Sequence, residues 1–399
     1  MSNKKVLMVM PGMKGGGAER VASLLLNEFY KNNIQCEFLL TSSTRDEIIS
    51  PDLNKKIPVT VLKELLSVEK NKTFSRVKQI VSTLLCKPFE ILKRPVPVMF
   101  SKFSFSVQYG EQIKALRNKF KEEPEATIIT FLQPSIPMVM LASRGLPNKV
   151  IFSERGDPRR LMKHRYGYGF IKKYYTRADV AVFQTNDAKK TYPMEIAEKG
   201  IVISNPIKAD LPDSYYGERE KVVTTFCRVS RQKNLPDLVK AFFLVHKDFS
   251  DYRLKIIGSP QNEDDKKVYE DLKGLIKDLD LTDFVDFMPF SENVHKDVIK
   301  DAVYVNSSDY EGMSNAMLEA MAIGMPVVCT DCPIGGASTI IRNDFNGILV
   351  PVNDSEKLAD AIKKVIGNKV FSAELSENAS AIRDELSLEN IAHRWMELL

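Results

Sequence analysis

Residues 302–320 have the sequence AVYVNSSDYEGMSNAMLEA, in which a short apolar run leads through a polar loop into a helix pattern. The β-branched and aromatic residues at its start predict a buried strand, and the later spacing of apolar residues predicts a helix. The same order of strand and amphipathic helix recurs in both halves of the chain. This alternation is typical of α/β proteins, in which helices cover parallel sheets.

The expected strands fall into two groups. In the first half they lie at Lys5–Met10, Gln35–Leu40, Thr127–Leu132, Lys149–Ser153, Val180–Gln184 and Ile201–Ser204. In the second half they lie at Lys221–Cys227, Tyr252–Gly258, Phe284–Met288, Ala302–Ser307, Pro326–Thr330 and Gly347–Val350. The length of 399 residues exceeds one ordinary core, so we expect two Rossmann-like domains with a cleft between them. They cover residues 1–204 and 221–385, with a linker at 205–220 and a C-terminal helix at 386–399.

The composition, with 44% hydrophobic and 27% charged residues, is that of a globular protein. No stretch approaches about 18 consecutive apolar residues, so we expect no membrane-spanning helix. The run Val6–Met10 leads to a proline and glycines rather than a cleavage site, which indicates a strand and a cytoplasmic protein. The five cysteines are scattered, so we expect them to be reduced and mostly buried. For Cys329-x-x-Cys332 we favour packing at a strand end over a metal or redox role.

The segment at residues 55–121 holds the chain's main concentration of positive charge. Its cations include Lys70, Lys72, Arg76, Lys78, Lys87, Lys93, Arg94 and Lys102, and its phenylalanines are Phe74, Phe89, Phe100, Phe103 and Phe105. Basic residues mixed with aromatics favour anionic lipid head groups or polyanionic substrates. The alternative is a solvated helical insertion whose phenylalanines are core. We expect contact with an anionic membrane surface, which would place the protein peripherally on the inner face of the membrane, and no nucleic-acid partner.

A glycine cluster follows the first strand, at Gly15, Gly16 and Gly17, and precedes a helix. Glycines here let a phosphate or sugar approach the backbone and the helix N-terminus, although a plain tight turn would use the same residues. A dinucleotide fingerprint would need a further glycine where Arg20 stands, and an acid at the end of the second strand, where there is none. NAD binding at this cluster is therefore disfavoured.

Cations gather where the first strand of the second domain ends, at Arg228, Arg231 and Lys233. They precede a helix that we expect Asn234 to cap. Cations beside a helix N-terminus make a diphosphate site, whereas the alternative is a solvated loop. The position at the carboxyl end of a strand favours the diphosphate site.

Two glutamates, Glu311 in a loop and Glu319 about two turns into the next helix, flank the start of that helix. The backbone N–H groups of Gly312–Asn315 are suited to a diphosphate and sugar hydroxyls. One carboxylate can accept a sugar hydroxyl and the other a ribose diol. The alternative is a surface loop with an exposed helix acid.

Arg228 and Lys233, followed by Asn-Leu-Pro, and Glu311-Gly312 with Glu319 together resemble family 4 of the retaining glycosyltransferases, which have the GT-B fold. The resemblance runs from Gly-Gly-Ala-Glu near the start to Asn-Gly-Ile-Leu-Val-Pro near the end, and is weak between residues 43 and 125. It implies a nucleotide-sugar donor bound mainly by the second domain, and a last helix that crosses back onto the first.

The resemblance also implies a role for each residue. Arg228 and Lys233 would hold the donor diphosphate, Glu319 the ribose and Glu311 the donor sugar. The remaining donor contacts would come from Gly312, Met313, Ser314, Asn315 and Phe290, the last of which would cradle the base, with Gly16 and Gly17 across the cleft.

One stretch departs from the family, because many relatives carry a histidine where this chain has Glu154-Arg155-Gly156-Asp157. Arg155 could steady the departing phosphate but cannot act as a base at neutral pH. We therefore place Glu154 and Arg155 on the acceptor side, with a structural role as the alternative for the carboxylates Glu154 and Asp157.

The function expected from these features is transfer of a hexosyl or N-acetylhexosaminyl unit from a UDP-sugar to a glycan or lipid-linked acceptor. Same-face attack would retain configuration, with the leaving diphosphate taking the acceptor's proton and Arg228, Lys233 and Glu311 at the reaction centre. Because cations and backbone groups supply the positive charge, we expect no metal and no cofactor; Asp278-Leu279-Asp280 is interpreted as solvated. The alternatives are a catalytically silent sugar-nucleotide-binding module of a polysaccharide assembly and an NAD-dependent oxidoreductase.

Overall fold

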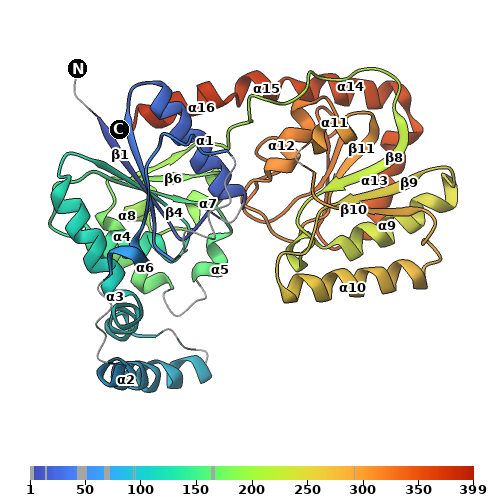
Figure 1. Cartoon of the computed structure of the whole chain (residues 1–399). Coiled ribbons are helices and arrows are strands. Elements are labelled where there is room, and N and C mark those ends of the chain that lie inside the picture. The colour runs from blue at the N-terminus through green and yellow to red at the C-terminus, as the bar shows by residue number, and fades with distance from the viewer. Residues whose placement is uncertain are drawn as a thin grey trace. The chain divides into compact units, whose positions relative to one another are not determined.

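The computed structural model describes residues 4–13, 16–42, 52–66, 72–92, 94, 96–162, 167–291 and 293–399. The chain forms two compact units. Unit 1 contains Met1–Ser204 together with Ile391–Leu399, and unit 2 contains Asn205–Asn390. Each unit is built around one parallel sheet (Figure 1).

The sheet of unit 1 has the strand order β3-β2-β1-β4-β5-β6-β7, and every neighbouring pair is parallel. Its strands are β1 (Lys5–Met10), β2 (Gln35–Leu40), β3 (Val59–Val61), β4 (Thr127–Phe131), β5 (Val150–Glu154), β6 (Val180–Phe183) and β7 (Gly200–Val202). The central strands are almost entirely buried because helices cover both faces, which explains their continuous apolar runs.

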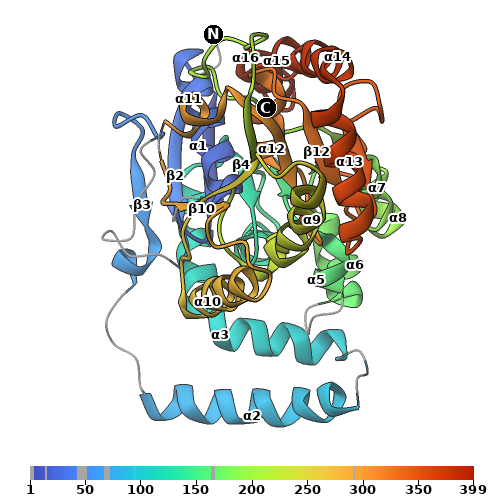
Figure 2. The ribbon, with the colours of Figure 1, turned by 90° about the vertical axis from the view of Figure 1, so that its right-hand side faces the viewer.

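The helices of unit 1 lie between its strands, with pairs between β3 and β4, between β5 and β6, and between β6 and β7. They are α1 (Gly17–Lys31), α2 (Lys72–Ile91), α3 (Val98–Glu122), α4 (Ser135–Ala142), α5 (Pro158–Met162), α6 (Tyr168–Tyr174), α7 (Asn186–Lys190) and α8 (Met194–Ala197), with 3₁₀ turns η2 (Leu62–Leu65) and η3 (Tyr175–Arg177). Helix α3 packs against α4 and α6, and α2 lies on the far side of α3 from the sheet (Figures 1 and 2).

The sheet of unit 2 has the order β10-β9-β8-β11-β12-β13 and is also parallel throughout. Its strands are β8 (Glu220–Phe226), β9 (Arg253–Ile257), β10 (Val285–Met288), β11 (Asp301–Asn306), β12 (Val327–Thr330) and β13 (Ile348–Val350). The 3₁₀ turn and helices are η4 (Arg231–Lys233), α9 (Leu235–Asp248), α10 (Glu263–Asp278), α11 (Val294–Val298), α12 (Asn315–Ala322), α13 (Ser355–Gly367), α14 (Lys369–Ser380) and α15 (Ile382–Glu385).

The last helix, α16 (Leu388–Met396), contributes to the core of unit 1. The indole of Trp395 is fully buried, with its ring centroid 5.6 Å from that of Phe131 at the end of β4. The guanidinium of Arg394 donates to the carbonyl oxygen of Val202, 2.7 Å away. The residues of α16 from Ile391 onward are therefore part of unit 1, far in sequence from the rest of it.

Both sheets reverse their strand order at one place. In unit 1 the strands β2 and β4 lie on opposite sides of β1. In unit 2 the strands β9 and β11 lie on opposite sides of β8. At such a reversal the loops after the two central strands part and leave a crevice at the carboxyl ends, where α/β proteins bind ligands. The position of the crevice in unit 2 is thus set by the loops after β8 and β11.

The structure confirms the predicted α/β class, with the predicted strands matching to within two residues at each end. Strand β3, a three-residue strand at the edge of the sheet, was not predicted. The predicted cap of α9 is wrong: Asn234 occupies the N-cap position, but its side chain accepts no hydrogen bond from the helix. Among the described residues, no helix combines the length and apolar character needed to cross a bilayer.

Candidate active site

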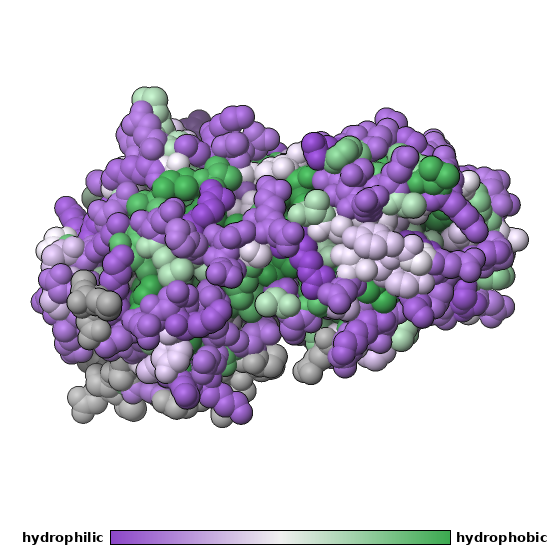
Figure 3. Space-filling view, turned by 90° about the horizontal axis from the view of Figure 1, so that it is seen from above, coloured by the Kyte–Doolittle hydropathy of each residue, from purple (hydrophilic) through white to green (hydrophobic). Residues whose placement is uncertain are grey.

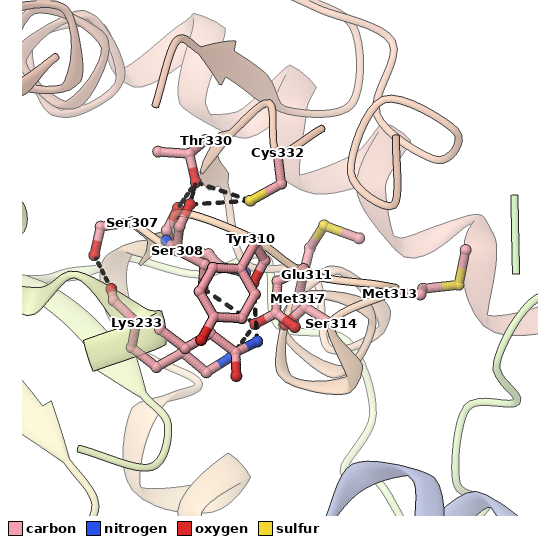
Figure 4. Close-up of polar contacts among 12 residues, drawn as sticks. Lys233, Ser307, Ser308, Tyr310, Glu311, Met313, Ser314, Met317, Thr330 and Cys332 are labelled. Carbon is pink, nitrogen blue, oxygen red and sulfur yellow. Dashed lines mark hydrogen bonds and ion pairs between the residues drawn. The ribbon is translucent and has the colours of Figure 1, made fainter. Parts of the chain in front are cut away.

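The loops after β8 and β11 are joined by hydrogen bonds at the crevice of unit 2 (Figure 4). The backbone N–H of Asp309 donates to the carbonyl oxygen of Gln232 at 3.0 Å, and the Gln232 amide donates to the carbonyl of Tyr310 at 2.9 Å. The Ser307 hydroxyl donates to the carbonyl of Lys233 at 2.9 Å. These bonds hold the two loops, which are far apart in sequence, in one fixed arrangement.

Lys233 and Glu311, the two charged residues predicted for the reaction centre, form an ion pair. Their side chains are only 17% and 14% exposed, and Glu311 also accepts a hydrogen bond of 3.1 Å from the Ser308 hydroxyl. Burial acts to lower the pKa of Lys233, but the charge and hydrogen bond of Glu311, together with the nearby Cys227 and Cys332, raise it by more, so the pKa is raised. Lys233 is therefore an ammonium ion held in a partly dry site, which strengthens its attraction for a second anion.

Hydrogen bonds that the sequence analysis did not predict fix the position of Ser308. Its N–H and hydroxyl both donate to the amide oxygen of Asn306, at 3.2 and 2.7 Å. Its carbonyl oxygen accepts from the Thr330 hydroxyl at 2.6 Å and from the Cys332 thiol at 2.9 Å. Burial raises the pKa of Cys332 to about 12, so this cysteine stays a thiol and acts as a donor. The network sets the position of the hydroxyl that contacts Glu311.

Asn234 has a different role from the predicted helix cap. Its backbone is in the left-handed region, with φ of 42°. Its side-chain amide donates to carboxylate and amide oxygens, those of Asp309 at 2.7 Å and Asn353 at 3.0 Å. Asn234 therefore turns the chain into α9 and ties the loop after β8 to Asp309.

Glu319 lies about one turn into α12, not two as predicted, and is 6% exposed. Its Oε2 is 2.8 Å from Nε2 of His295, which is 5% exposed and belongs to α11. The His295 ring packs edge-on against Phe226, with centroids 5.6 Å apart. The orientation of the Glu319 carboxylate is thus set by a histidine that the sequence gave no reason to select.

The loop before α12 is held by both its own cap and a distant asparagine. The Ser314 hydroxyl accepts from the backbone N–H of Met317 at 3.3 Å, which caps α12. The amide of Asn205, placed in the linker by the sequence analysis, donates to the carbonyl of Met313 at 3.2 Å and to Asn315 Oδ1 at 2.6 Å.

Gly312, the glycine of this loop, is covered by a second loop. The backbone at Gly336, after β12, approaches so closely that a Cβ there would lie 1.8 Å from the carbonyl oxygen of Gly312. The conformation of the loop before α12 therefore depends on the absence of a side chain at position 336.

Arg228 and Phe290 lie at the same edge of the sheet and are more exposed. The Arg228 guanidinium is 3.8 Å from the Asp265 carboxylate and 3.5 Å from the Gln261 amide oxygen. Burial raises the pKa of the neighbouring Cys227 thiol. Phe290 follows β10 with 72% of its surface exposed. Its ring is accessible to a planar base.

The predicted residues of unit 1 lie at the carboxyl ends of β1 and β5. Gly16 and Gly17 begin α1, and the N–H of Gly16 donates to the Glu19 carboxylate at 2.6 Å in a capping box. Gly15 lies outside the described residues.

Glu154 and Arg155 are buried, each 8% exposed. Burial raises the pKa of Glu154, against the hydrogen bond of 3.0 Å that its carboxylate accepts from Tyr192. Burial lowers the pKa of Arg155 to about 9, and its guanidinium lies over the Phe131 ring, 5.0 Å from the centroid. These contacts hold both side chains inside unit 1.

The family model described as "Glycosyl transferases group 1" matches residues 208–381, a segment that includes Arg228, Lys233, Glu311 and Glu319. Unit 2 therefore contains a group 1 glycosyl transferase segment. This segment carries the Lys233–Glu311 pair.

Several relatives of the chain are bacterial proteins. A Haemophilus influenzae protein named an uncharacterized glycosyltransferase is 27% identical, over 56% of this chain and 62% of that protein. The poly(glycerol-phosphate) alpha-glucosyltransferase of Bacillus subtilis is 26% identical, over 60% of this chain and 35% of that protein. The chain thus spans less than two thirds of either. An alpha-1,4-N-acetyl-D-galactosaminyltransferase of Campylobacter jejuni, whose full name includes diNAcBac-PP-undecaprenol, is 23% identical over 99% of this chain and 98% of that protein.

Solved structures show the same fold. Anabaena HepE in complex with UDP superimposes with a TM-score of 0.75, at 17% identity, over 98% of each chain. TarM superimposes with a TM-score of 0.74, at 16% identity, over 100% of this chain and 99% of that one. The chain has the GT-B fold that its sequence predicts.

Proposed function

We propose that the protein is a retaining glycosyltransferase that moves a hexosyl or N-acetylhexosaminyl unit from a UDP-sugar to a glycan or lipid-linked acceptor. The observation that carries this proposal is the buried Lys233–Glu311 pair at the crevice between β8 and β11. A charged pair at this place in a group 1 glycosyl transferase segment supplies one group for an anion and one for hydroxyls.

The donor diphosphate would bind Lys233, Arg228 and the N-terminus of α12. Lys233 would exchange part of its contact with Glu311 for a phosphate oxygen, because its three N–H donors can serve both anions. Glu311 would then accept a hydroxyl of the donor sugar. Glu319, oriented by His295, would accept the ribose hydroxyls, and the exposed ring of Phe290 would stack on the base.

The chemical step would be attack by the acceptor hydroxyl on the face that the diphosphate leaves. The bond between the sugar and the diphosphate breaks, the new glycosidic bond forms, and a diphosphate oxygen takes the acceptor's proton. The residues near the reaction contribute by stabilising negative charge on the leaving group, the task of Lys233 and Arg228. Because these cations carry that charge, the proposed reaction needs no metal and no cofactor.

The names of the relatives support the substrate classes. HepE was solved with UDP and also with UDP-glucose, and a pneumococcal O-GlcNAc transferase was solved with UDP and GlcNAc. The Campylobacter relative is named for an undecaprenol-linked glycan. By analogy with these proteins, the donor here would be a UDP-sugar and the acceptor a glycan, on a lipid carrier at the inner face of an anionic membrane.

A thermal-shift series tests the donor assignment. UDP and UDP-sugars should stabilise the protein without added magnesium, by about 2.7 kcal/mol at a hundredfold excess over Kd, whereas ADP and GDP should stabilise it less. Lys233→Ala should abolish the shift, and Lys273→Ala, an exposed lysine on α10, should leave it unchanged.

Three results would contradict the proposal. Stabilisation by NAD alone would favour an oxidoreductase, and a UDP response only with magnesium would exclude metal independence. Tight UDP-sugar binding without UDP release, when a panel of glycan and lipid-linked acceptors is added, would indicate a silent binding module.

A further inference from the structure

Helix α2 exposes several aliphatic side chains, which together with Leu92, the residue after the helix, we call the outer stripe of α2. Its members and their exposed fractions are Ile80 59%, Val81 41%, Leu84 66%, Ile91 69% and Leu92 64%. Ile80, Leu84 and Ile91 are spaced by four and seven residues, so they lie above one another on one face of the helix. The outer stripe is thus an apolar surface along one side of α2, interrupted by Lys87.

The opposite face of α2 is already occupied by α3. Ser82 and Cys86 are buried there, and the rings of Phe89 and Phe100 pack with centroids 6.1 Å apart. Phe105 is also buried, at 1% exposure, against α6. The sequence analysis offered the phenylalanines of this segment as lipid contacts, with a place in the core as the alternative. The structure buries Phe105 and packs Phe89 on Phe100, whereas Phe103 on α3 is 37% exposed. On α2 itself, the most exposed apolar side chains that the structure describes are aliphatic.

The outer stripe contrasts with other faces of the molecule. On the face that carries α14, α15 and α16, hydrophilic side chains dominate and apolar ones form separate patches (Figure 3). Figure 2 shows that α2 lies beyond α3 from the sheet of unit 1. The outer stripe is exposed, whereas Ser82 and Cys86 of α2 are buried.

The charge around the outer stripe is strongly positive. Residues 72–102 contain seven cations and one acid, Glu90. Among the described side chains, Lys78, Lys87 and Arg94 are exposed, and Lys87 stands in line between Leu84 and Ile91. Lys72 and Arg76 belong to α2, but the structure does not describe their side chains. Lys70 and Lys93 lie outside the described residues. An apolar helix face with cations on and beside it matches the boundary between acyl chains and anionic head groups.

We propose that α2 lies flat on an anionic membrane and inserts its outer stripe among the lipid head groups. This proposal rests on the proposed function in one respect: a lipid-linked acceptor would be located in the membrane that α2 contacts. A second copy of the chain is the competing occupant, and it would bring the same cations against each other. Ile80 and Ile91 lie about 17 Å apart along the helix, which sets the length of the contact line.

The first test is sedimentation of the full-length protein with phosphatidylcholine vesicles with and without 30% phosphatidylglycerol. The Leu84→Glu/Ile91→Glu variant should lose at least tenfold in partitioning to the anionic vesicles. The matched control is Val370→Glu, on α14 of unit 2, where the valine is equally exposed at 70%. It should bind like the unaltered protein. Lys78→Gln/Lys87→Gln should bind more weakly, and salt should weaken binding of the unaltered protein.

A second test reports insertion directly. The chain contains one tryptophan, Trp395, which is buried in the core of unit 1. Leu84→Trp should therefore add an exposed fluorophore whose emission shifts to shorter wavelength on anionic vesicles and is quenched by brominated acyl chains. Val370→Trp should show neither change.

Several outcomes would overturn the proposal. Unchanged vesicle binding by Leu84→Glu/Ile91→Glu would do so, as would an unquenched Leu84→Trp signal. A dimer that dissociates in Leu84→Glu/Ile91→Glu would assign the outer stripe to a second copy of the chain. UDP-induced thermal stabilisation should be the same in Leu84→Glu/Ile91→Glu and the unaltered protein, so failure of the membrane proposal can be told apart from failure of the proposed function.

Discussion

The two sheets reverse their strand order in the same way, yet their crevices carry different chemistry. At the crevice of unit 2, the loops after β8 and β11 bring together Lys233 and Glu311. At the crevice of unit 1, the loops after β1 and β4 carry Gly16 and Gln133, and the Gln133 amide donates to Tyr175 at 2.7 Å. Strand order therefore places a crevice, and the loop residues alone decide what it can bind.

Buried carboxylates show the same contrast. Glu311 in unit 2 pairs with a cation that a bound anion can share. Glu154 in unit 1 accepts hydrogen bonds from Tyr192 and from the backbone N–H groups of Arg155 and Gly156. In the first arrangement the cation can also contact a ligand, whereas in the second the carboxylate accepts its hydrogen bonds from residues of unit 1.

The largest expected effect is loss of the cation in unit 2. Lys233→Ala should lower kcat/KM for the UDP-sugar by about 10²–10³-fold, the usual result of removing one group that stabilises transition-state charge. Steady-state UDP release measures it. Glu311→Ala should lower it too, and the double variant should lose less than the product of the two, because the residues are in contact. Full additivity would contradict a shared role.

A smaller effect is expected from the loop that covers Gly312. Gly336→Ala should displace the backbone before α12 and lower kcat/KM by up to about 10²-fold, since a shift of about 1 Å can cost that much. Gly274→Ala is the matched control, because a Cβ on that glycine of α10 meets nothing within 4 Å. Equal activity of the two variants would show that Gly336 does not set the loop.

His295 should matter through Glu319. His295→Phe keeps the ring against Phe226 but removes the hydrogen bond to the carboxylate, so UDP affinity should fall about tenfold, or about 1.4 kcal/mol. Isothermal titration measures it. In a Glu319→Gln background, His295→Phe should have little further effect on affinity. An equal loss in both backgrounds would count against positioning.

The smallest effect on donor binding is expected in unit 1. Tyr192→Phe removes the hydroxyl that donates to Glu154, and should lower the free energy of unfolding by about 1–3 kcal/mol. UDP affinity should not change. Denaturant titration and calorimetry separate the two quantities, and a loss of UDP affinity at unchanged stability would place Glu154 in the donor site.

The sequence predicted most of the fold because buried parallel strands leave a continuous apolar signal, as in β4 and β11. It also selected Lys233, Glu311 and Glu319 by residue type and by position at strand and helix ends. It could not supply their partners. His295 and Asn205 contact α12 and the loop before it from 24 and about 110 residues away, and no local pattern encodes such contacts.

The helix pair α2 and α3 shows that composition alone does not predict which apolar side chains are exposed. Cations and phenylalanines over residues 55–121 indicated an unusual surface, but not which apolar side chains would face water. That choice depends on the packing of α3, which takes up Cys86 and Phe89 and leaves Leu84 outside. Helical periodicity fixes which residues share a face, while the neighbouring helix determines which face is left over.

The place of Trp395 has a consequence for synthesis of the chain. This residue completes the core of unit 1 beside Phe131, although more than 260 residues separate the two in sequence. Because Trp395 follows unit 2 in the sequence, the core of unit 1 can be completed only after all of unit 2, Asn205–Asn390, has been synthesised. The unit that begins first is therefore finished last. Residues 205–390 are the natural fragment to express alone, and a fragment ending at Ser204 would lack part of its own interior.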